Sequence, residues 1–177
     1  MYSILRSISL AHILKERYAQ VLLKRGVLPL LENLDRCIEA SQNSMISAGV
    51  VTECADCAQN EEGTCCGLRT GNKYDSLILL VNLLLGRSLP EKAQFPDRCY
   101  FLTDKGCALR ARHVICVNFV CQRLRNSIPI AALIRLQAIA GEEIHTLFLL
   151  EENIKKIIGH EIAAIKKQER HVLQIRI

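Results

Sequence analysis

Eight of the nine cysteines in this 177-residue chain lie between positions 54 and 121. They are Cys54, Cys57, Cys65, Cys66, Cys99, Cys107, Cys116 and Cys121. The first four fall in the stretch CADCAQNEEGTCCG, residues 54–67. A chain of this length can bury a hydrophobic core and does not need disulfides in order to fold. The crowded thiols therefore require an explanation other than the stability of a small domain.

The remaining composition predicts packed helices. Half of the residues are hydrophobic, only 5% are aromatic and tryptophan is absent, so the core must consist mainly of Leu, Ile, Val and Ala. We expect one domain, residues 1–177, of the all-α class. Its parts are an N-terminal helical pair (1–49), a cysteine-rich, loop-dominated region (50–126), and a long helix or helix pair (127–177). The helical flanks are predicted to pack around the middle region.

Apolar residues recur every three or four positions in both flanks, which is the spacing of one helix face. In the first helix they are Ile4, Ile8, Ala11, Leu14, Tyr18 and Leu22; in the second, Leu30, Leu34, Cys37, Ile38, Ser41 and Met45. Lys24-Arg25-Gly26 is a helix stop signal, and so short a connection predicts antiparallel helices. From Pro129 to about Gln168 the pattern predicts one long helix or two, with Gly141 as the weak point.

The middle region holds most of the turn signals and one apolar run, Leu77 to Leu85. Asp75 or Ser76 is expected to cap a short helix there, and Gly86 to end it. Few other segments of this region are periodic. We therefore expect it to depend on ligand bonds more than on burial.

Charge and targeting signals narrow the classes of function. The formal net charge is +5, but no basic run interleaved with aromatic residues is present, which argues against nucleic-acid binding. The N-terminal segment is broken by Arg6, Lys15 and Arg17 and does not read as a secretory signal. The longest apolar run is too short to cross a bilayer. These features predict a cytoplasmic protein with no membrane segment.

The spacing of the eight cysteines indicates metal ligation. Four thiolates complete a tetrahedral zinc site or hold one iron–sulfur cluster, and the pair Cys54 and Cys57 has the CxxC spacing that presents two sulfurs to one metal. Disulfides, buried inert thiols and a redox-active CxxC pair remain as alternatives. Cys37 is different, because it lies on the apolar face of a predicted helix, and we assign it to the core.

The choice between zinc and iron–sulfur stays open, with a preference for iron–sulfur. Zinc sites usually combine two CxxC-like pairs, and this chain has one, with the other ligands spread over long spacers. His113 is a reserve ligand should one cysteine not bind. Six nearby cations are candidates to offset the charge of the thiolates: Arg69, Lys73, Arg98, Lys105, Arg110 and Arg112.

The order of these motifs resembles the YkgJ cysteine-cluster family of zinc- or iron-chelating domains. The resemblance rests on five pieces: CADC (54–57), CC (65–66), CYFL (99–102), GCAL (106–109) with Arg112 downstream, and CVNFVC (116–121). It departs from the family in CYFL, where CPFL is usual, in Arg112-His113, where Arg-Pro is usual, and in a longer spacer after Cys57. All eight cysteines are retained.

The resemblance implies a metal-binding domain whose eight cysteines hold iron–sulfur or zinc in a structural, electron-transfer or metal-handling role. Some members of the family are similar to flagellin lysine N-methylases, so a cluster-dependent enzyme is the alternative. Closed four-thiolate sites leave no open position for water or substrate, which favours a protein without catalytic activity. A protein partner is compatible with each of these functions, and the sequence names no substrate.

Overall fold

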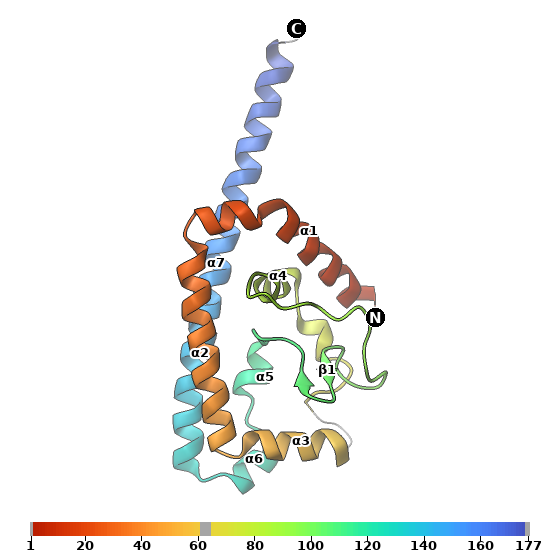
Figure 1. The fold of residues 1–177 in the computed structure, drawn as a ribbon, viewed down its shortest axis with the longest axis vertical. Helices are drawn as coiled ribbons and strands as arrows, with labels where there is room; N and C mark the ends of the chain where they lie inside the picture. The colour runs from red at the N-terminus through yellow and green to blue at the C-terminus, as the bar shows by residue number, and fades with distance from the viewer. Residues whose placement is uncertain (1, 61–64, 176–177) are drawn as a thin grey trace.

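A computed structural model describes residues 2–60 and 65–175 of the chain, and this part is mostly helical (Figure 1). The elements in chain order are α1 (Tyr2–Lys24), α2 (Val27–Ser47), α3 (Val50–Asn60), the 3-10 turn η1 (Gly71–Lys73), α4 (Ser76–Leu84), β1 (Leu102–Thr103), β2 (Gly106–Cys107), α5 (Val114–Asn118), α6 (Gln122–Ser127) and α7 (Ile130–Ile175). The predicted all-α fold is confirmed. The described residues of the middle region form α3, η1, α4, α5, most of α6 and a short antiparallel hairpin, β1–β2.

Helix α1 ends and helix α2 begins at the predicted stop signal, but the two helices do not pair along their lengths. Gly26 adopts a left-handed φ of 85° between α1 and α2, a conformation that glycine takes without strain. In Figure 1, α1 runs above α4 at a wide angle to α2. The main partner of α1 is α4, and the main partner of α2 is α7. The antiparallel prediction was wrong because α1 buries its apolar face against the middle region.

Helix α4 lies at the centre of the fold. Asp75 caps it as predicted, since its carboxylate accepts hydrogen bonds from the backbone N–H groups of Leu77 (2.9 Å) and Ile78 (3.1 Å). Every residue from Leu77 to Leu83 is buried. Gly86, with a left-handed φ of 77°, follows the helix. A helix that is apolar on all sides requires neighbours on all sides.

Helix α7 is one continuous helix and not two. It begins directly after Pro129 and passes through Gly141 without a break. Its first part packs along α2, while the end of the helix projects beyond the other elements (Figure 1). None of the helices in the described residues combines the length and the apolar character that crossing a membrane requires.

The buried apolar residues form two clusters. The main cluster surrounds α4 and includes Tyr74, Phe101 and Cys99, with Cys66 and Cys116 packed against it. The second cluster, at the α2–α3 junction and the start of α7, consists of Met45, Val50, Val117, Leu124, Ile128, Leu133, Leu136 and Ala140. Cys54 and Cys121 pack against this second cluster. The cysteine-bearing segments therefore divide between the two clusters.

Candidate metal centre

The eight predicted ligands come from separate elements on one side of α4. Cys54 and Cys57 lie on α3, Cys107 on β2 and Cys116 on α5. Cys121 is the residue that precedes α6, and Cys99 lies shortly before β1. In Figure 1 the helices α3, α5 and α6 and the hairpin all lie below α4. The fold thus collects segments that are up to 67 positions apart in the sequence.

Electrostatic effects among the thiols show that these segments are close together. Burial, together with the charges of Cys65, Cys121 and Cys57, raises the pKa of Cys54 to about 11. The pKa of Cys66 is raised mainly by a hydrogen bond with the Cys65 side chain, then by burial and by the charges of Cys65, Cys116 and Cys99. Like charges in a shared, partly buried site disfavour simultaneous ionisation.

The segment around Cys99 supplies backbone donors to sulfur. Burial raises the pKa of Cys99, and hydrogen bonds from the backbone N–H groups of Phe101 and Leu102 oppose that rise. Cys107 is exposed on β2 as a residue, but desolvation of its sulfur raises its pKa to about 11, against a backbone hydrogen bond from Leu109. Such donors stabilise a thiolate, and in metal–thiolate centres hydrogen bonds to sulfur tune the metal.

Arg112 is the candidate cation whose charge acts on three of the thiols. Burial raises the pKa values of Cys54, Cys107 and Cys116, and the Arg112 charge opposes the rise at all three. Its Nε is buried and has no hydrogen-bond partner among the described residues, while its Nη2 lies 3.5 Å from Met45 Sδ. A buried N–H without an acceptor is costly unless an anion faces it. Cysteines that bind a metal as thiolates would supply such an anion beside Arg112.

Of the other five candidate cations, Arg110 has partners elsewhere. Its Nε donates to Asp35 at 2.6 Å and its Nη1 to Gln42 Oε1 at 2.7 Å, both on α2. Arg110 therefore fastens the segment before α5 to α2 and does not neutralise sulfur.

Asn82 fastens the same segment to α4, and the sequence analysis missed this residue. Its side-chain Nδ2 donates to the carbonyl oxygens of Ile78 and Ala111, each at 2.9 Å. Its Oδ1 accepts from the backbone N–H groups of Arg110 (2.7 Å) and Ala111 (3.0 Å). A single amide in an otherwise apolar helix was the signal that could have identified it.

Tyr74 and His113 position Cys116. The Tyr74 hydroxyl lies 3.5 Å from Cys116 Sγ and accepts a hydrogen bond from the His113 backbone N–H at 3.2 Å. His113 Nδ1 accepts from the backbone N–H of Ile115 and so caps α5. This nitrogen is engaged in the cap, which gives His113 a local structural role, and ligation through its other ring nitrogen, Nε2, stays a prediction.

Helices α3 and α6 are joined beside the cysteines by Arg123. Its Nε donates to Glu53 at 2.7 Å, and its Nη2 pairs with Asp56. Glu53 and Asp56 precede Cys54 and Cys57 directly, and Arg123 follows Cys121 by two residues. The ion pairs therefore hold the two cysteine-bearing segments side by side.

The thiols are neighbours, yet they do not form a coordination shell as they stand. Among residues 2–60 and 65–175, no three His, Cys, Asp or Glu side chains are grouped so that they could hold a metal ion. The donor set itself fits a soft metal, because thiolate sulfur is the ligand that zinc and iron–sulfur clusters prefer. The unpartnered Nε of Arg112 fits the negative charge of such a centre.

Cys37 lies apart from this group. It is half-buried on α2, and its Sγ is 3.6 Å from Thr146 Oγ1 on α7. Its place at a helix–helix contact agrees with the prediction that it belongs to the packing and not to the cluster.

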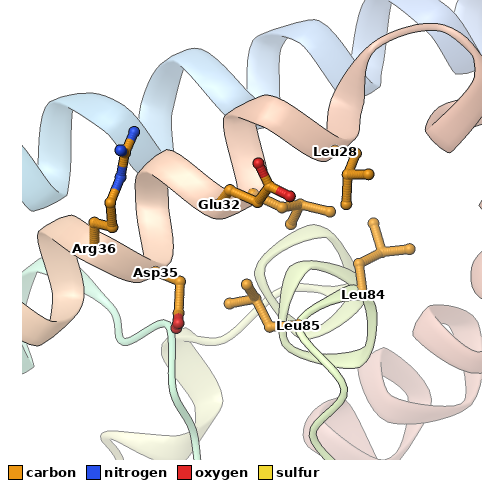
Figure 2. Close-up of a pocket in the computed structure, with 7 residues that line it drawn as sticks. Leu28, Glu32, Asp35, Arg36, Leu84 and Leu85 are labelled. Carbon is orange, nitrogen blue, oxygen red and sulfur yellow. The ribbon is translucent and has the colours of Figure 1, made fainter.

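A pocket of 470 Å³ lies at the contact of α2 with the end of α4 (Figure 2). Its walls are Leu28, Leu31, Glu32, Asp35, Arg36, Leu84 and Leu85. None of the eight cysteines lines it, and Asp35 already binds Arg110. This pocket is separate from the candidate metal centre.

No protein-family model, no curated protein and no solved structure matches the chain. The likeness to the YkgJ cysteine-cluster family therefore rests on the quoted residues.

Proposed function

We propose that residues 50–126 form a metal-binding module in which the eight cysteines hold an iron–sulfur cluster or zinc, as in the YkgJ-type family that the motifs resemble. The role of such a module is structural, electron-transferring or metal-handling. The observation that carries the proposal is the gathering of cysteines from α3, the hairpin and α5 within reach of the Arg112 charge, together with Cys121 at the α6 cap, which packs against the same apolar cluster as Cys54.

The charges of the thiols support a bound cation. Burial and mutual repulsion raise the pKa values of Cys54, Cys66, Cys99, Cys107 and Cys116. Such thiols hold their protons at neutral pH as long as no metal is bound. A soft metal cation displaces the protons, and its positive charge offsets the repulsion among the thiolates that form.

The first test is the metal content of the protein purified without oxygen. We expect stoichiometric zinc, or iron with an equivalent amount of acid-labile sulfide and a brown colour that bleaches on reduction. Iron with sulfide identifies the cluster, and zinc without colour identifies the zinc site. A colourless protein without zinc or iron would overturn the proposal.

Cys37→Ser is the matched control, because Cys37 has no thiol neighbour in the cluster and contacts Thr146 instead. We expect this variant to keep the full metal content of the wild type. For protein that contains iron, addition of S-adenosylmethionine distinguishes the two roles. An unchanged visible spectrum supports the structural or electron-transfer role, whereas a perturbed one supports a cluster-dependent methyl transfer.

A further inference from the structure

We propose that the eight cysteines form two separate four-thiolate sites, and this inference rests on the metal-binding function proposed above. Site A consists of Cys54, Cys57, Cys65 and Cys121, and site B of Cys66, Cys99, Cys107 and Cys116. Each site would hold one thiolate-bound centre, either a zinc ion or an iron–sulfur cluster.

The packing of the cysteines separates the two groups. Cys54 and Cys121 pack against the second apolar cluster, whose members include Val50 and Leu124. Cys66, Cys99 and Cys116 belong to or pack against the main cluster around α4. Thiols that pack against different apolar clusters are positioned by different sets of side chains. Sulfurs that share an anchor can be held at fixed separations as ligands of one metal.

The elements of site A are joined to one another. Cys54 and Cys57 are three positions apart on α3, so they lie on the same face of that helix. The ion pairs of Arg123 with Glu53 and Asp56 bring α6 against this helix. Cys121 precedes α6 directly and therefore lies at the same junction.

The elements of site B are joined by backbone hydrogen bonds. The backbone N–H of Cys99 donates to the carbonyl oxygen of Cys66 at 2.7 Å, and Gly67 forms an isolated β-bridge with Arg98. The hairpin pairs Leu102 with Cys107, which brings Cys107 back beside the segment that follows Cys99.

Cys116 joins site B through an aromatic bridge. The Tyr74 hydroxyl lies 3.5 Å from Cys116 Sγ, and the Tyr74 ring lies edge-on to Phe101 with the centroids 5.0 Å apart. Phe101 in turn follows Cys99 by two residues. Tyr74 thus ties α5 to the Cys99 segment in the main cluster.

The adjacent pair Cys65 and Cys66 is the point where the sites meet. The two side chains are hydrogen-bonded to each other, and the charge of Cys65 acts on Cys54 as well as on Cys99 and Cys116. Cys66 packs against the main cluster, as Cys116 does, and Cys99 belongs to that cluster, whereas Cys65 is exposed. Cys65 is therefore the thiol of the pair that is left for site A. One thiol from each site therefore lies at a shared boundary. Each site has four sulfur donors when its boundary thiol is included.

The test compares double variants that remove two cysteines from one site or one cysteine from each. Zinc, iron and acid-labile sulfide are measured per chain after anaerobic purification. We expect Cys54→Ser and Cys107→Ser each to retain half of the wild-type metal. Cys54→Ser combined with Cys121→Ser should also retain half. Cys54→Ser combined with Cys107→Ser should lose nearly all of it.

The adjacent pair gives the sharpest version of the same test. Cys65→Ser combined with Cys54→Ser should keep half of the metal, whereas Cys65→Ser combined with Cys66→Ser should lose both centres although only neighbouring residues change. Far-UV circular dichroism confirms that the helices persist. If a variant unfolds, Cys57→Ser replaces it in site A and Cys99→Ser in site B.

The outcomes separate this inference from the proposed function. A wild type with one centre per chain, or equal losses in same-site and cross-site double variants, would overturn the two-site assignment and leave metal binding intact. A wild type without zinc or iron would overturn both.

Discussion

At the residue scale, one buried polar side chain, Asn82, uses all of its hydrogen-bonding groups in the interior. Asn82 is fully buried, and both its oxygen and its nitrogen are used twice. The amide connects α4 to the segment that carries Arg112 and leads to Cys116. One side chain therefore couples the central helix to the candidate metal centre.

We predict that Asn82→Ala lowers the free energy of unfolding by about 2–4 kcal/mol, because two backbone N–H groups and one carbonyl lose their partner in a buried place. Urea denaturation followed by circular dichroism measures the change. Asn33→Ala is the control, since Asn33 is exposed on α2 and accepts one hydrogen bond from Arg36. This control should change stability by less than about 0.5 kcal/mol. Equal effects of the two substitutions would contradict the role of Asn82.

At the element scale, α4 combines local signals with complete burial. Its ends are encoded by neighbours in the sequence, with Asp75 as the cap before it and Gly86 after it. Its middle has no polar face except Asn82, and all of Leu77 to Leu83 is buried. The element is therefore defined locally and stabilised by its surroundings.

We predict that Asp75→Ala destabilises the protein by about 1 kcal/mol, because the N–H groups of Leu77 and Ile78 lose the side-chain oxygen that accepts from them. Asp75→Asn should restore most of that stability, since asparagine is an equally good cap. Thermal or urea unfolding at pH 7 gives the comparison. A loss of the same size in both variants would show that charge, and not the cap, is the contribution of Asp75.

At the scale of the whole molecule, the middle region is not a passive insert between two helical flanks. Helix α1 packs mainly on α4, and α4 also contacts α7. The expectation that the middle region depends on ligand bonds more than on burial is therefore wrong for α4, which is buried within the main cluster. Loss of metal should affect the cysteine-bearing segments more than α4, because α4 has the main cluster around it.

The pH dependence of global stability provides a further prediction at this scale. Burial, and after it the charge of Asp75, raises the pKa of Glu151 on α7 to about 7. The folded state thus disfavours the ionised carboxylate, so this group destabilises the protein above pH 7. The effect fades as the pH falls toward 4.5, the ordinary pKa of the side chain.

We expect Glu151→Gln to raise the free energy of unfolding at pH 8 by about 1–2 kcal/mol, a range that allows for solvent screening of a side chain that is only partly buried. The gain should shrink at pH 5. Urea unfolding at the two pH values tests this, with Glu142→Gln, an exposed position on the same helix, as the control. A gain of the same size at both pH values would contradict the elevated pKa of Glu151.

Much of the fold was predictable because its signals are local. The helical period in both flanks, the stop at Gly26, the cap at Asp75 and the end at Gly86 each depend on a few neighbouring residues. The soft-metal chemistry that we propose for the candidate site also depends on the residue type and number of the cysteines, and it stays a prediction. The packing role of Cys37 also followed from its helical position.

By itself, the sequence determined the helices, their caps and the donor atoms of the candidate site. Only the tertiary structure decided that α1 packs on α4 instead of α2, that Asn82 and Tyr74 hold the segment before Cys116, and which cysteines are neighbours. The physical reason is the separation along the chain of the residues that interact. A helix period or a cap involves residues within one turn of each other. The grouping of Cys54 with Cys121, or of Cys66 with Cys99, depends on which apolar cluster buries each segment and on single hydrogen bonds between distant parts of the chain.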